Sequence, residues 1–141
     1  MRVIKTLGLL SLIVSGAALA HSHASTPPPA GAHQAEVAPL MTKALTDYPG
    51  KEAMMISVTY PPGAVDPVHR HDAHAFLYVV EGSIVMGVKG SKEVTLTAGQ
   101  TFYEGPNDIH TVGRNASLTK PAKFVVVLLK NQGEDVVLPV D

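Results

Sequence analysis

The chain has 141 residues, no cysteine, no tryptophan and a formal net charge of -1. This length suits one compact domain, and the near-neutral charge argues against an electrostatic nucleic-acid binder. Without cysteine, neither a disulfide framework nor a thioether lipid anchor can form, so a hydrophobic core must stabilise the fold. Because the charge argues against nucleic acid, we expect small molecules or other proteins as partners.

The N-terminal segment is typical of a secretory signal peptide. Arg2 and Lys5 precede an apolar run that ends on "ALA" at 18–20, a small-x-small cleavage pattern. The apolar run is shorter than the roughly 20 residues that span a bilayer. We predict a signal peptide at 1–20 and a periplasmic or secreted mature protein that has no membrane attachment after cleavage.

The segment "HSHASTPPPAGAHQAE" at 21–36 is rich in Pro, Ala, His and Ser and has no apolar periodicity. Three consecutive prolines favour an extended polyproline conformation. This composition predicts a flexible arm at 21–36, followed by a single domain at 37–141.

From Val37 onward, short β-rich runs alternate with turns containing Gly, Pro, Asn and Asp, at the intervals of sandwiches and barrels. An antiparallel structure of this kind must hide its edges, which favours a closed barrel or a two-sheet jelly roll. The pattern predicts an all-β domain with strands at 40–46, 53–60, 68–71, 76–81, 83–88, 93–96, 101–104, 109–115, 123–130 and 136–139.

Two of these strands are apolar on both faces. In 76–81, Phe76, Tyr78 and Val80 share one face and apolar residues also occupy the other, and "FVVVLLK" at 124–130 is apolar at successive positions. Such strands are expected to be buried on both sides, inside the sandwich or at a subunit contact, so a homodimer is compatible with the pattern. A ligand cavity would be lined by residues of this kind, together with Met54, Ile56, Met86 and Val112.

Four histidines in two strand-and-turn segments point to a metal site. His69 and His71 are two residues apart, which in a strand puts both imidazoles on one face, about seven ångströms apart along the chain. His110 follows the turn "EGPND", and a hairpin-rich sheet could bring it beside the pair. His74 lies at a loop-to-strand junction, where periodicity does not determine its direction. Imidazole is a good ligand for Zn, Cu, Ni and Fe.

The two segments resemble the two motifs of the cupin superfamily. "GAVDPVHRHDAHAFLYVVEG" at 63–82 is similar to the first motif, with Gly63 and Gly82 at its glycines and His69 and His71 at its paired histidines. "GQTFYEGPNDIHTVGRN" at 99–115 is similar to the second, with His110 at its histidine. The resemblance covers roughly 41–129. It implies a cupin-type jelly-roll β-barrel, or double-stranded β-helix, of the small single-domain, quercetinase-like kind.

The resemblance breaks at the metal-binding glutamate of the first motif. Ala75 occupies that position, or Phe76 in the alternative spacing, so the carboxylate is absent in either register. A bulge at "DAH" would turn His74 inward to fill the gap, whereas a regular strand would leave it a half-exposed turn residue. Glu104 is a weaker candidate, either as an outer ligand or proton acceptor beside the metal or as an ordinary strand-end carboxylate.

Three or four neutral imidazoles would hold one divalent transition metal ion. Without the carboxylate, retention of hard ions such as Mn should weaken, so Fe, Cu, Zn or Ni are expected. The cupin family includes dioxygenases that use three histidines without the glutamate. The resemblance therefore implies a metal-dependent dioxygenase acting on a small enolic or phenolic compound. The alternative is a cupin module that binds metal or a small ligand without turnover, because the fold serves many functions.

Overall fold

The computed structural model describes residues 34–140, which form an all-β fold. The predicted signal peptide and the arm up to residue 33 lie outside the described residues. Within 34–140, no helix is long and apolar enough to cross a membrane. The strands are β1 (Glu36–Ala44), β2 (Lys51–Tyr60), β3 (His69–Arg70), β4 (Ala73–Glu81), β5 (Ser83–Val88), β6 (Val94–Thr97), β7 (Thr101–Glu104), β8 (Ile109–Asn115) and β9 (Ala122–Asn131).

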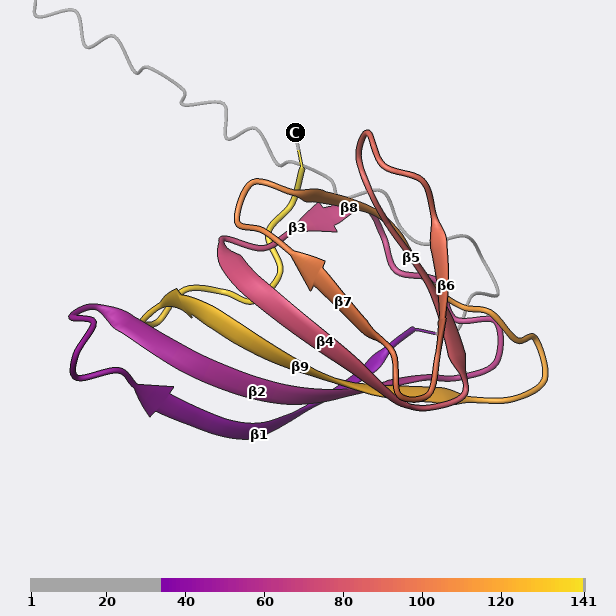
Figure 1. The fold of residues 1–141 in the computed structure, drawn as a ribbon, viewed down its shortest axis with the longest axis horizontal. Helices are drawn as coiled ribbons and strands as arrows, with labels where there is room; N and C mark the ends of the chain where they lie inside the picture. The colour runs from indigo at the N-terminus through magenta and orange to yellow at the C-terminus, as the bar shows by residue number, and fades with distance from the viewer. Residues whose placement is uncertain (1–33, 141) are drawn as a thin grey trace, which may run out of the picture.

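The strands form the two facing antiparallel sheets of a jelly-roll barrel (Figure 1). One sheet has the order β1-β2-β9-β4-β7 and the other β3-β8-β5-β6. Consecutive strands often lie in different sheets, so β3 and β8, which are distant in sequence, pair directly. β4 likewise pairs with strands that are not its neighbours in sequence, because it lies between β9 and β7. This topology brings both histidine segments to one end of the space between the sheets.

The predicted strand boundaries largely agree with the structure. The strands at 83–88, 101–104 and 109–115 are confirmed to the residue. The first strand begins at Glu36, so it includes the end of the predicted arm. The predicted strand at 136–139 is wrong, because the segment forms only an isolated bridge between Leu138 and Arg70.

The core lies between the two sheets, with side chains alternating inward along β4 and β9. The buried side chains of β4 are those of Ala73, Ala75, Leu77 and Val79. The inward-facing side chains of β9 include those of Phe124, Val126 and Leu128. The expectation of burial on both faces is wrong for β4: Phe76 is 48% exposed and Tyr78 51% exposed. Their face is turned away from the second sheet, and no further layer of residues 34–140 covers it.

One glycine of the first motif is required by close backbone approach. Gly82 connects β4 to β5 with a φ of 74°, and a Cβ added there would lie 2.6 Å from the carbonyl oxygen of Pro121 and 2.8 Å from Cα of Ala122. Any side chain would collide with this backbone, so only glycine allows the tight turn that carries the chain from one sheet to the other.

Candidate metal centre

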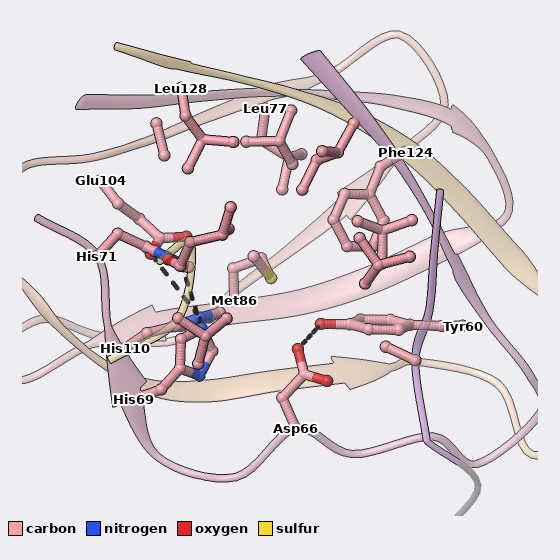
Figure 2. A pocket seen from close by; sticks show the side chains of 18 of the residues that line it. Tyr60, Asp66, His69, His71, Leu77, Met86, Glu104, His110, Phe124 and Leu128 are labelled. Atoms are coloured by element: carbon pink, nitrogen blue, oxygen red, sulfur yellow. Dashed lines mark hydrogen bonds and ion pairs between the residues drawn. The ribbon is translucent and has the colours of Figure 1, made fainter. Parts of the chain in front are cut away.

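Three of the predicted histidines meet at one end of the barrel interior (Figure 2). His69 on β3 and His110 on β8 are paired across the strands, and His71 is the first residue after β3. Nε2 of His69 lies 3.2 Å from Nε2 of His71 and 3.3 Å from Nδ1 of His110. The three ligand atoms all lie within 4.8 Å of one another, so they could hold one metal ion.

Backbone carbonyls orient the first two imidazoles. Nδ1 of His69 donates to the carbonyl oxygen of Pro67 at 2.8 Å, and Nδ1 of His71 donates to that of Val136. With its proton on Nδ1, each neutral ring presents an unprotonated Nε2 to the centre. Two lone pairs then face each other at 3.2 Å with no proton between them. A cation between the two nitrogens would remove this repulsion.

The spacing of the nitrogens also fits a metal ion. With metal–nitrogen distances of about 2.0–2.1 Å, adjacent ligands of one tetrahedral or octahedral ion lie about 2.8–3.4 Å apart. The observed separations of 3.2 and 3.3 Å fall in this range. A histidine that binds a metal ion through one ring nitrogen donates a hydrogen bond from the other, often to a backbone carbonyl. His69 and His71 both do so.

His110 is the most deeply buried ligand of the three. Burial, with a smaller contribution from the neighbouring His69, lowers its pKa to about 4. Burial also lowers the pKa of His71, so both rings are neutral at pH 7 and able to coordinate. Nε2 of His110 has no hydrogen-bond partner among the described residues. Its ring packs against Gly113, where an added Cβ would lie 2.9 Å from Cε1 of His110.

Glu104, the last residue of β7, completes the group. Its side chain points inward and is 5% exposed, and Oε2 lies 3.7 Å from Nε2 of His71 and 3.7 Å from Nδ1 of His110. Burial raises its pKa to about 7, with further contributions from the charges of Asp108 and Asp66. The sequence left open whether Glu104 faced the barrel interior or was an ordinary strand-end carboxylate, and the structure places it inside.

His74 does not join the cluster. Residue 73 already begins β4, so regular alternation puts Ala73 inside and His74 on the exposed outer face. There its Nδ1 shares a hydrogen bond of 2.7 Å with the hydroxyl of Tyr103, and the two rings stack. The hypothesis that a bulge turns His74 inward is therefore wrong, because the strand is regular at this point.

A cavity of about 610 Å³ opens beside the histidines, within the usual range for small-molecule sites. Of the expected lining residues, Ile56 and Met86 are confirmed. Phe76 and Tyr78 instead face outward, and their inward neighbour Leu77 lines the cavity. The walls are mainly apolar side chains of both sheets, including Leu77, Phe124, Val126 and Leu128.

A second polar group in this cavity, Tyr60 and Asp66, was not predicted from the sequence. Figure 2 shows the Tyr60 hydroxyl directed at the Asp66 carboxylate, to which it donates a hydrogen bond. Burial raises the pKa of both side chains, and in Asp66 the bond from Tyr60 opposes this shift. Alternation in the predicted strand at 53–60 could have indicated the inward direction of Tyr60, but Asp66 lies between the predicted strands 53–60 and 68–71, where periodicity does not determine a direction.

Comparisons with known proteins show the family to which the chain belongs. Residues 56–128 match the family model of the cupin domain. The match covers more than half of the chain, and the protein therefore belongs to the cupin family. No curated protein sequence matches the chain.

Solved structures similar to this one share its fold. A conserved protein with a double-stranded beta-helix domain from Klebsiella pneumoniae subsp. pneumoniae MGH 78578 has a TM-score of 0.59 at 15% identity, over 82% of this chain and 92% of that one. The DMSP lyase DddQ from Ruegeria pomeroyi DSS-3 has a TM-score of 0.55 at 20% identity, over 61% of this chain. An oxalate oxidase in complex with the substrate analogue glycolate has a TM-score of 0.57 at 25% identity, over 74%. This chain spans 42% of the lyase and 54% of the oxidase.

Proposed function

We propose that this protein is an exported, metal-dependent cupin that binds one divalent transition metal ion through His69, His71 and His110. Its substrate would be a small enolic or phenolic compound, which it would oxygenate with dioxygen. The observation that carries the proposal is the pair of Nε2 atoms, 3.2 Å apart, whose lone pairs face each other beside an apolar cavity. The similarity to an oxidase crystallised with a small hydroxy acid supports a small oxygen-donor ligand.

Each part of the site has a role in this reaction. When bound, the ion would supply Lewis acidity and, for Fe or Cu, redox chemistry. The carbonyl oxygens of Pro67 and Val136 hold the imidazoles in the ligating tautomer. The apolar walls exclude water and accept the ring or carbon frame of the substrate. Asp66, oriented by Tyr60, accepts a hydrogen bond from a substrate hydroxyl.

Elemental analysis tests the metal site. We expect roughly one ion per chain in untagged protein from its native compartment, and none in a His69→Ala/His71→Ala variant. His74→Ala is the matched control, because His74 lies on the outer face, and it should keep the metal. Equal metal content in the wild type and the double variant would refute the site.

Oxygen uptake then separates the enzyme from the binding module. We expect consumption of dioxygen with a panel of flavonols and enediols that disappears in the His69→Ala/His71→Ala variant. Tight ligand binding without any oxygen uptake would instead favour a cupin that stores or senses a small molecule. Mass spectrometry of the exported chain tests the predicted cleavage after Ala20.

A further inference from the structure

The carboxylate at the centre comes from a strand where the sequence motif does not place it. Ala75 on β4 and Glu104 on β7 are paired across the two strands. Ala75 is 3% exposed and lines the cavity, and Glu104 is equally buried on the same face. Cβ atoms of directly paired residues are about 4.5–5.5 Å apart. A side chain from either position therefore reaches the same volume between the sheets.

This buried carboxylate has histidine nitrogens as neighbours but no hydrogen-bond donor. Its Oε2 lies 3.7 Å from Nε2 of His71, which has an unprotonated lone pair because Nδ1 donates to Val136. Oε2 is also 3.7 Å from Nδ1 of His110. Within 34–140, the Glu104 carboxylate accepts no hydrogen bond. A buried carboxylate without a donor is costly unless it is protonated or a cation pairs with it.

We propose that Glu104 is a direct ligand of the metal ion and that it replaces, from β7, the carboxylate missing at Ala75. This inference rests on the proposed metal site of His69, His71 and His110. The separation of 3.7 Å from two ligand nitrogens is a few tenths of an ångström above the upper end of the spacing of about 2.8–3.4 Å between adjacent ligands in one coordination shell. A small rotation of the glutamate side chain closes that difference.

A fourth, anionic oxygen ligand changes which metals the site retains. Three neutral nitrogens favour Zn, Cu, Ni and Fe, whereas a carboxylate oxygen suits harder ions such as Mn(II). With Glu104 in the coordination shell, Mn(II) binds more strongly than the histidines alone would allow. Weak binding of Mn was expected because the glutamate is missing at position 75. Glu104 would supply that carboxylate from β7, so the reason for this expectation no longer applies.

Isothermal titration of metal-free protein with Mn(II) and with Zn(II) tests this role. In Glu104→Gln we expect the Mn(II) affinity to fall by about 100-fold or more and the Zn(II) affinity by much less, because the remaining ligands are nitrogens. The double variant Ala75→Glu/Glu104→Ala should recover most of the Mn(II) affinity. Glu81→Gln, an exposed carboxylate at the end of β4, is the control and should bind like the wild type.

Each outcome bears on the inference. Equal losses for the two metals in Glu104→Gln would indicate a carboxylate that acts only through the histidines and would overturn it, as would no loss at all. A folded double variant that does not recover Mn(II) would refute the equivalence of positions 75 and 104. If the wild type binds neither metal, the proposed metal site itself fails. If His69→Ala loses metal binding while Glu104→Gln keeps it, the histidine site stands and Glu104 is not a ligand.

Discussion

Gly113 on β8 leaves the space that the His110 ring occupies. A Cβ built on Gly113 would lie 2.9 Å from Cε1 of His110, and 3.0 Å from both the Asp66 carboxylate and the Tyr60 hydroxyl. A single methyl group at this point would therefore press on the metal ligand and on the second polar group of the cavity at once.

The first prediction follows from this contact. Gly113→Ala should lower the affinity for Zn(II) by about tenfold and destabilise the fold by about 1–3 kcal/mol, the usual range for overpacking. Titration calorimetry and chemical unfolding measure the two effects. Gly87→Ala on β5 is the control, because its nearest contacts would be 3.4 Å and ordinary packing can absorb them. Unchanged metal affinity in Gly113→Ala would show that the His110 ring can move freely.

The second prediction concerns removal of the metal. A ligand that binds only the folded state stabilises it by about 2.7 kcal/mol at 100 times its dissociation constant. Adding Zn(II) to metal-free protein should raise the melting temperature in the wild type and in His74→Ala, but not in His69→Ala/His71→Ala. Scanning calorimetry measures the shift. An equal shift in the double variant would place the bound metal elsewhere.

The third prediction concerns pH in the metal-free protein. The folded-state pKa of Glu104 is raised from 4.5 to about 7 by burial, so the unfolded chain ionises first. The free energy of unfolding should therefore fall as the pH rises from about 4.5 to 7. Burial lowers the pKa of His110 from 6.5 to about 4, which destabilises the fold as the pH falls below 6.5 and opposes the first effect in the same window.

Glu104→Gln isolates the carboxylate contribution. Without metal, its stability relative to the wild type should increase between pH 4.5 and 7 by on the order of 3 kcal/mol and stay level above that. Urea unfolding at several pH values measures the difference. The substitution thus stabilises the empty protein while weakening metal binding. A difference that is constant with pH would show that Glu104 is already ionised in the folded state.

The fourth prediction concerns Tyr60 and Asp66. Tyr60→Phe removes the hydrogen bond to a mostly buried carboxylate, and the unpaired group should cost about 1–3 kcal/mol of stability. Binding of a hydroxylated ligand should weaken because Asp66 loses its orientation, while the metal content should not change. Thermal unfolding, ligand titration and elemental analysis separate the three effects. Loss of metal in a folded Tyr60→Phe would assign this pair to the metal site instead.

The fifth prediction concerns the outer face of β4. Phe76 and Tyr78 are about half exposed, and Tyr103 of β7 lies beside Phe76 with its ring centroid at 5.3 Å. An apolar patch of this kind supports self-association, and we propose that it is the homodimer contact. Tyr78→Lys should shift the sedimentation coefficient from dimer to monomer. Leu118→Lys, on a residue that is 83% exposed between β8 and β9, is the control. A wild-type monomer would contradict the proposal.

Local sequence patterns were enough to predict the all-β architecture and part of the site. Turn residues at regular intervals and the alternation within strands come from short-range backbone preferences, which is why three strands were correct to the residue. The spacing of His69 and His71 predicted a shared face, and the two motifs predicted that His110 would join them.

The rest depended on contacts between residues that are distant in the chain. The sequence alone determined a β-barrel, because strand period and turn chemistry are local properties, and its resemblance to the two cupin motifs implied that three histidines converge. Only the tertiary structure decided that Glu104 pairs with Ala75, that His74 faces outward and that Tyr60 meets Asp66. These follow from strand register and from which face of β4 meets the second sheet, and a shift of one residue would reverse every side chain.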